Sequence, residues 1–167
     1  MPRSLKDFIH RHEPLNQGHH HLKSGLGAVV AMLVVGALAS LTGMPLMIAP
    51  FGATAVLIFG QPRSALAQPA NVIGGYALAA SIAAVLASTL PDQVWVAALG
   101  VGFSIMAMSA LRVTHPPAGA VPLVIFGSHL DPLETLFVVL AGSVLLVMIA
   151  VIHHFIPPKI EYPAAIP

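Results

Sequence analysis

Charged side chains are almost absent from the long middle of this chain. Between Ser24 and Pro158 only five residues carry a formal charge, and these are Arg63, Asp92, Arg112, Asp131 and Glu134. Each lies at a break between two apolar runs. The whole chain is 57% hydrophobic and 8% charged, whereas a soluble domain carries about 25% charged residues. This pattern predicts an integral membrane protein that spans the bilayer several times.

Four apolar stretches are long enough to cross a bilayer, which takes about 20 helical residues. They cover residues 24–42, 70–90, 94–111 and 135–156. Two shorter stretches, 45–60 and 117–127, are interrupted by proline and glycine. We therefore expect an all-α fold with four long transmembrane helices and two short broken ones. A polar N-terminal tail (1–23) precedes the transmembrane domain (24–158), and a C-terminal tail (159–167) follows it.

The two short stretches resemble each other. Residues 50–60 align without gaps on residues 117–127, and six of the eleven positions are identical at an offset of 67 residues. The same offset brings the first long stretch onto the third and the second onto the fourth. The chain is therefore predicted to hold two repeats, about 24–90 and 94–156, each a long helix, a short broken segment and a long helix.

The loop charges indicate an orientation, because lysine and arginine collect on the cytoplasmic side of short loops. If both short segments cross the membrane, there are six crossings. With the N-terminus in the cytoplasm, Arg63 and Arg112 then fall inside, whereas Asp92 and Glu134 fall outside. The two repeats would have opposite topology. If the short segments are re-entrant instead, four crossings put both arginines outside, so we prefer the inverted repeat. The expected location is the inner cell membrane.

Paired broken segments at matching positions in two halves predict a transport site. Irregular backbone at membrane depth survives only inside the protein or beside a watery cavity. Freed backbone N–H groups at the start of a short helix favour an anion. We expect the substrate-binding residues to be Phe51, Gly52, Thr54, Asn71, Arg112, Thr114, His115, Pro116, Pro117 and Gly119. Gln61 and Arg63 are expected to form a cytoplasmic vestibule.

The ionisable residues lie at the second break only, since the position of His115 in the first repeat holds Ile48. Arg112 and His115 together favour an anion, and histidine titrates near neutrality. The alternatives are an arginine at the membrane interface and a histidine that caps a helix. Thr54 is expected either to bond to a solute or to bond back to its own helix. Asn71 is expected to cap its helix or to bond to a broken segment.

The run THPPAGA, from Thr114 to Ala120, resembles the signature of the HPP family of membrane proteins. The stretches FGATAVL (51–57) and LAQPANVIGG (66–75) are also similar to that family, and the resemblance covers about residues 24–156. It implies a small multi-helix membrane protein, usually drawn with four helices. Plant and cyanobacterial relatives are associated with nitrite transport, so the resemblance makes nitrite the first candidate. Relatives often have a basic residue at the position of Ala70 and a histidine at that of Tyr76, and these differences leave room for another solute.

The expected function is a transporter or channel for a small inorganic anion. A structural or regulatory membrane subunit and a cation-selective pore are the alternatives. An enzyme is not expected, because no Cys, Asp or Glu lies inside an apolar run. We expect no cofactor and no metal. The net charge of +1 and the lack of a basic stripe argue against a nucleic-acid partner. A homo-oligomer, a dimer or trimer within the lipid bilayer, is expected to pack through small-residue faces.

Overall fold

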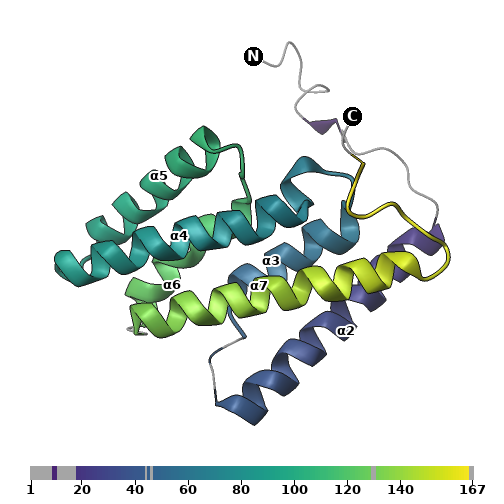
Figure 1. Cartoon of the computed structure of the whole chain (residues 1–167), viewed down its shortest axis with the longest axis horizontal. Coiled ribbons are helices and arrows are strands. Elements are labelled where there is room, and N and C mark those ends of the chain that lie inside the picture. The colour runs from purple at the N-terminus through teal and green to yellow at the C-terminus, as the bar shows by residue number, and fades with distance from the viewer. Residues whose placement is uncertain (1–8, 11–17, 44, 46, 129–130, 166–167) are drawn as a thin grey trace.

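The computed structural model describes residues 9–10, 18–43, 45, 47–128 and 131–165, and the elements within these ranges are all helical (Figure 1). In chain order they are α2 (Gly18–Thr42), α3 (Ala49–Ala55), the π-helical turn η1 (Val56–Gly60), the 3₁₀ turn η2 (Ala65–Ala67), α4 (Pro69–Thr89), α5 (Val94–Ala110), the 3₁₀ turn η3 (Pro116–Ala120), α6 (Val121–Ser128) and α7 (Pro132–Phe155).

Three helices, α2, α4 and α7, are long and apolar enough to cross a membrane. The fourth predicted long helix, α5, has 17 residues, which corresponds to about 26 Å of rise against a hydrocarbon core of about 30 Å. The all-α prediction is confirmed, whereas only three of the four expected helices reach full spanning length. Helix α2 begins at Gly18, so the last residues of the predicted polar tail are helical.

Local sequence explains where the helices begin and end. Helix α2 stops at Gly43, whose φ of +71° suits glycine and few other residues. Helix α7 starts where the Asp131 side chain accepts a hydrogen bond from the Glu134 N–H, with a proline in its first turn. It ends at Phe155, with Ile156 as its C-cap and the pair Pro157-Pro158 immediately after, as proline cannot continue a helix.

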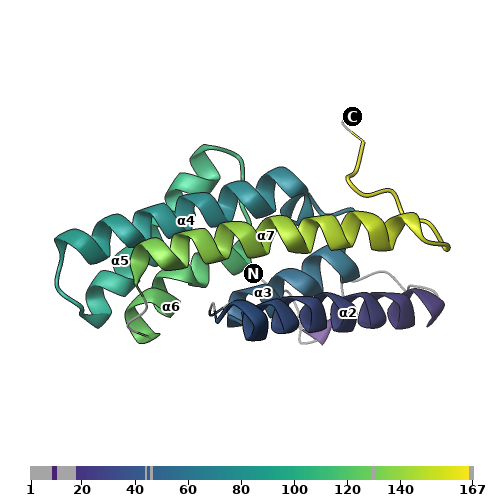
Figure 2. The ribbon, with the colours of Figure 1, turned by 60° about the horizontal axis from the view of Figure 1, so that its bottom comes forward.

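Helices α4 and α7 lie against each other along the middle of the molecule (Figures 1 and 2). Helix α2 packs on α7, and α5 packs on α4. In Figure 2 the colours show that α2 and α4 run in the same direction and α7 in the opposite one. The short segment α3–η1 therefore carries the chain back, so that α4 starts at the same end of the molecule as α2.

The two breaks have the same local form. Ile48 (φ −97°, ψ 144°) and His115 (φ −132°, ψ 100°) are both extended, and each precedes a helical segment with proline in its first turn. The Phe51 N–H donates to the Ile48 carbonyl at 3.0 Å, and the Ala118 N–H donates to the His115 carbonyl at 3.0 Å. After that the segments differ, since the first passes from α-helix to a π-helical turn and the second from a 3₁₀ turn to α-helix.

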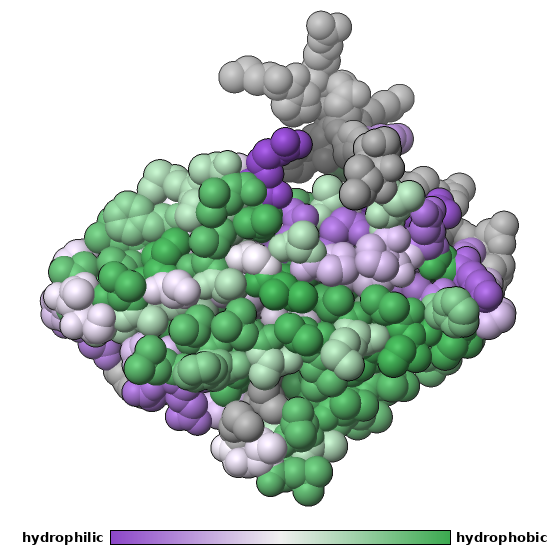
Figure 3. Space-filling model, viewed as in Figure 1, coloured by the Kyte–Doolittle hydropathy of each residue, from purple (hydrophilic) through white to green (hydrophobic). Residues whose placement is uncertain are grey.

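The outer surface is apolar. Figure 3 shows hydrophobic side chains over most of the visible face, with hydrophilic ones gathered at the end where α2 begins and α7 ends and near the start of α7. Large apolar side chains on α2, α5 and α7 are exposed, among them Leu33, Trp95 and Phe137 at 67%, 52% and 69%. Such a surface suits lipid or a neighbouring subunit rather than water.

Candidate functional site

The two broken segments meet inside the protein. Helix α3 contacts η3, and both segments lie against other helices. Helix α4 can approach the second break because two adjacent glycines face it. A β-carbon on Gly75 would lie 2.7 Å from the His115 β-carbon, and one on Gly74 would lie 3.3 Å from the Val113 side chain. These glycines bring α4 close to the HPP motif.

A hydrogen-bonded chain of buried side chains lies where the segments meet. Thr54 on α3, Tyr76 on α4 and His115 before η3 are each 0% exposed. The Thr54 Oγ1 lies 2.8 Å from the Tyr76 hydroxyl and 2.8 Å from the His115 Nε2. The His115 Nδ1 lies 2.8 Å from the carbonyl oxygen of Leu66 on η2. Polar groups at this depth are costly unless they are paired, and here all of them have partners.

Chemistry fixes the direction of every hydrogen bond in this chain when the histidine is neutral. The Leu66 carbonyl only accepts, so the His115 Nδ1 carries the proton and Nε2 is the acceptor. The Thr54 hydroxyl must then donate to Nε2, and the Tyr76 hydroxyl must donate to Thr54. His115 stands at the N-cap position of η3, but its side chain makes no cap hydrogen bond. The helix-cap alternative is therefore wrong for this side chain, and so is the back-bonding alternative for Thr54.

Phe51 closes one side of this chain. Its ring packs edge-on against Tyr76, with ring centroids 5.4 Å apart. Its other neighbour is Gly142 on α7, where a β-carbon would lie 2.3 Å from ring atoms. Pro117, from the HPP motif, is also buried, whereas Pro116 beside it is exposed. The first break thus supplies an aromatic wall and a hydroxyl, and the second supplies an imidazole.

Asn71 ties α4 to the second break. Its Nδ2 donates to the Thr114 carbonyl at 3.0 Å, which is the second of the two alternatives for this residue. Gln68 holds the loop after the first break, because its Nε2 donates to the carbonyls of Pro62 and Ser64 at 2.8 and 2.9 Å. These amides fix the backbone on both sides of the Leu66–His115 hydrogen bond.

Arg112 occupies a strained backbone position at the end of α5. Its φ is +59°, in the left-handed region that costs a non-glycine residue about 1–2 kcal/mol. The Val113 N–H donates to the Met108 carbonyl and the Arg112 N–H to that of Ser109, which is the Schellman pattern whose left-handed position usually holds glycine. Arg112 is exposed. Strain kept at such a position points to a functional constraint.

The two predicted vestibule residues, Gln61 and Arg63, are exposed in the turn after η1. Arg63 precedes Leu66 by three residues, and Arg112 precedes His115 by three residues. Because Leu66 and His115 are hydrogen bonded, the two arginines flank the same junction between the segments.

Gly52 and Gly119, at equivalent positions in the two segments, are open. A β-carbon at either position would meet no atom within 4 Å outside its immediate neighbours, and both residues are half-buried. Unlike Gly75 and Gly142, they are therefore not required for packing within one protomer.

The protein family described as "HPP, transmembrane region" matches residues 13–163 of this chain. The chain belongs to the HPP transmembrane family. Its HPP tripeptide is the one that places His115 in the buried chain. Two transmembrane proteins of Dictyostelium discoideum are similar to it, at 34% identity over 128 residues and 32% over 125. These matches cover 72% and 70% of this chain but 45% and 40% of the relatives, so the HPP chain spans less than half of their length. No solved structure matches it.

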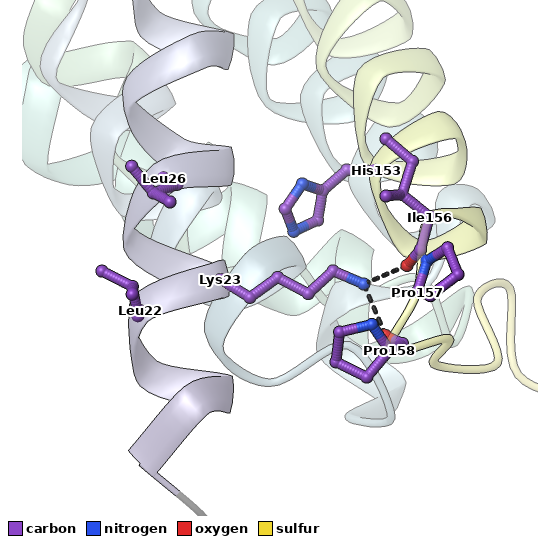
Figure 4. A pocket seen from close by; sticks show the side chains of 7 residues that line it. All are labelled: Leu22, Lys23, Leu26, His153, Ile156, Pro157 and Pro158. Carbon is purple, nitrogen blue, oxygen red and sulfur yellow. Dashed lines mark hydrogen bonds between the residues drawn. The ribbon is translucent and has the colours of Figure 1, made fainter.

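A second polar cluster of this HPP protein lies at the end where α2 begins and α7 ends (Figure 4). The Lys23 Nζ donates to the carbonyls of Ile156 and Pro158, at 2.6 Å each. Its positive charge thus lies near the C-terminal end of α7, where the helix dipole is negative and stabilises a cation. The His154 Nε2 donates to the Ile58 carbonyl in η1 at 2.7 Å. Lys23 and His153 line a pocket of about 240 Å³ beside apolar Leu22 and Leu26. These contacts fasten η1 and α2 to the end of α7.

The C-terminal tail is held in place as far as it is described. The Tyr162 hydroxyl donates to the Ala67 carbonyl at 2.9 Å, and the Ala164 N–H donates to the Gln68 side chain at 2.8 Å. Burial raises the pKa of Tyr162 to about 12, so its hydroxyl stays protonated at neutral pH. The tail thus covers η2, the turn that supplies the Leu66 carbonyl.

Sequence reasoning named Tyr76 as a difference from relatives but did not place it in the site. It lies in the middle of α4, and its partner Thr54 is 22 residues away in sequence. The available signal was a phenol inside an apolar membrane helix, where a polar group normally has a specific partner.

Proposed function

We propose that this HPP protein is a transporter or channel for a small inorganic anion, with nitrite as the first candidate. One observation carries the proposal. The two proline- and glycine-broken segments of an apolar membrane bundle meet at a buried chain of polar side chains, Thr54, Tyr76 and His115. Polar groups at membrane depth mark substrate and proton pathways, and broken segments mark the binding sites of transporters.

The proposed route begins at the exposed arginines Arg63 and Arg112, which attract an anion toward the junction of the segments. It leads between the segments, where the open positions Gly52 and Gly119 allow a solute to approach the backbone. In the structure described here the Thr54 hydroxyl and both His115 nitrogens are bonded within the protein. These groups are also fully buried, so an anion has no access to them in this conformation, which is an occluded one.

A second candidate function follows from the same hydrogen bonds. Three buried side chains whose polar atoms are all paired can also serve as a structural pin, that is, as hydrogen bonds that only hold the helices together, in a regulatory or structural membrane subunit. The strained Arg112 and the open glycines favour transport, because a pin needs neither. A cation-selective pore has less support, because no carboxylate lies in the buried chain.

We further propose an inverted-repeat architecture, with the first three helical segments and the last three crossing the membrane in opposite directions and the N-terminus in the cytoplasm. It is supported by the common direction of α2 and α4, the opposite direction of α7 and the matching geometry of the two breaks. In each unit the return crossing contains one residue with extended backbone, Ile48 or His115, followed by a short helical segment. The proposed assembly is a homo-oligomer that covers part of the exposed apolar surface.

The topology is testable because the chain contains no cysteine. A single cysteine at Gln61 should react with an impermeant maleimide only from the side that holds the N-terminus. A cysteine at Asp92, in the loop between α4 and α5, should react only from the other side. Labelling of Gln61→Cys from the side opposite the N-terminus would refute the inverted repeat.

The function itself is tested by flux into proteoliposomes that contain the purified protein. Nitrite, nitrate, formate, chloride and fluoride are offered singly, and protein-free vesicles give the passive background. Saturable uptake of one anion, inhibited by an excess of the same anion, is the expected result. Correctly folded protein that moves none of the five would overturn the proposal in favour of the structural pin, and uptake of a cation instead would favour a cation pore.

A further inference from the structure

The buried chain can change direction as one unit. With neutral His115, the Tyr76 hydroxyl donates to Thr54 and the Thr54 hydroxyl donates to Nε2, at 2.8 Å in each step. A proton added to Nε2 makes that nitrogen a donor, so Thr54 must accept from it. The Thr54 hydroxyl then has Tyr76 as its acceptor, and the Tyr76 O–H is released to donate elsewhere. A proton added to His115 therefore leaves the Tyr76 hydroxyl, at the other end of the three hydrogen-bonded side chains, free to donate to another group.

The same change can occur by proton transfer without rotation of any hydroxyl. A proton arrives at the Tyr76 oxygen while the proton of Tyr76 moves to the Thr54 oxygen and that of Thr54 moves to Nε2. One O–H bond breaks and one forms at each hydroxyl, and the net product is an imidazolium at His115. The donor of the arriving proton is the conjugate acid of a weak-acid anion, and it is left at Tyr76 as the anion.

A protonated His115 would balance the charge of an anion bound in the buried site. No charged side chain contacts the buried chain in the described part of the protein. Tyr76 is the titratable group that faces His115, with ring centroids 5.4 Å apart, and neither α3 nor η2 offers another. The nearest arginines along the chain, Arg63 and Arg112, are exposed. An anion alone would be uncompensated at this depth and costly, whereas an anion beside an imidazolium is a neutral pair.

We propose that Tyr76, Thr54 and His115 form a proton relay, and that an anion bound at the Tyr76 hydroxyl moves together with a proton held on His115. The proposal rests on the anion-transport function above and adds the substrate class, a monovalent weak-acid anion accompanied by one proton. Tyr76 becomes the residue that contacts the anion. His115 holds the balancing charge, and the Leu66 carbonyl holds the imidazole in the orientation that directs Nε2 to Thr54.

The test measures proton and nitrite entry together in proteoliposomes with a pH-sensitive dye inside, at clamped membrane potentials. The wild-type protein should move one proton per nitrite, and the rate should follow the pH gradient and not the potential. Protein-free vesicles give the passive entry of neutral nitrous acid. Tyr76→Phe keeps the ring and removes the hydroxyl, so gradient-driven uptake should fall about 10-fold or more. Tyr162→Phe is the matched control, since it also removes a buried hydroxyl that bonds to a neighbour, and its rate should stay near wild type.

Nuclear magnetic resonance provides a readout on the wild-type protein itself. In wild-type protein with ¹⁵N-labelled histidine, the His115 signals are those that His115→Gln lacks. They should show a proton on Nδ1 and none on Nε2 without anion, and an imidazolium after nitrite is added at the same pH. A proton on Nε2 in the anion-free protein would overturn the relay.

The failure of the relay differs from the failure of transport. Nitrite uptake that follows the membrane potential and continues unchanged in Tyr76→Phe would overturn the relay and leave an anion channel. An absence of anion uptake in wild type would overturn the proposed function and the relay together.

Discussion

Thr54→Val is the sharpest test of the buried chain, because valine keeps the shape of threonine and removes the hydroxyl. That hydroxyl makes two hydrogen bonds, to Tyr76 and to His115. Side-chain hydrogen bonds between membrane helices contribute about 0.6 kcal/mol on average and about 1.7 at most. Losing two of them should lower the free energy of unfolding by about 1–3 kcal/mol. The cost should lie toward the upper end, since two buried polar atoms lose their partner.

Thr135→Val is the matched control. Thr135 is also buried, at 1% exposure, but its hydroxyl makes a single local bond, to the Asp131 carbonyl at 2.8 Å. Reversible unfolding of both variants in mixed detergent micelles, followed by helical circular dichroism, gives the two free energies. We expect Thr54→Val to lose at least about 1 kcal/mol more than Thr135→Val. Equal losses in the two variants would refute the three-residue chain as a stabilising unit.

Two further predictions separate stability from transport. Alanine at Gly52 or Gly119 meets no atom within 4 Å and should leave unfolding unchanged or raise its free energy by about 0.5–1 kcal/mol, while nitrite uptake falls because the methyl fills the solute's path. Gly142→Ala should instead lower the free energy of unfolding by about 1–3 kcal/mol, since its β-carbon would lie 2.3 Å from the Phe51 ring. Normal nitrite uptake by both Gly52→Ala and Gly119→Ala would show that the solute does not pass these glycines. Arg112→Gly relieves a left-handed residue worth about 1–2 kcal/mol, which the added freedom of the unfolded chain offsets in part, by about 0.4–1 kcal/mol. Stability should stay within about 1 kcal/mol of wild type and uptake should fall, with Arg112→Lys restoring most of it; a large loss of stability in Arg112→Gly would make the arginine structural.

The sequence was sufficient for features that depend on local composition. Apolar length predicted the long helices, and proline and glycine predicted both breaks, whose equivalent residues Ile48 and His115 share an extended backbone. Helix α5 ends one residue before the predicted bound at 111, and helix α2 begins at Gly18, ahead of the predicted start at 24. Both differences concern helix ends, which depend on packing and on capping as well as on hydropathy.

Side-chain pairing across the bundle was beyond the reach of sequence reasoning. Thr54 and His115, which were expected to belong to one site, are hydrogen bonded, but their direct contact spans 61 residues and depends on how α3 lies against η3. The partner atom of the imidazole is a backbone carbonyl, that of Leu66, which no pattern of side chains can reveal. Tyr76 was noted as a position where relatives often have a histidine, and it was not placed in the site.

The central claim is that the junction of the two broken segments is an anion transport site. The most direct measurement is the initial rate of nitrite uptake into proteoliposomes for wild type and for His115→Ala, with equal amounts of folded protein confirmed by circular dichroism. Saturable uptake by wild type and loss of that uptake in His115→Ala are the expected results. Equal uptake by the two proteins would remove His115 from the site, and no uptake by folded wild-type protein would contradict the account as a whole.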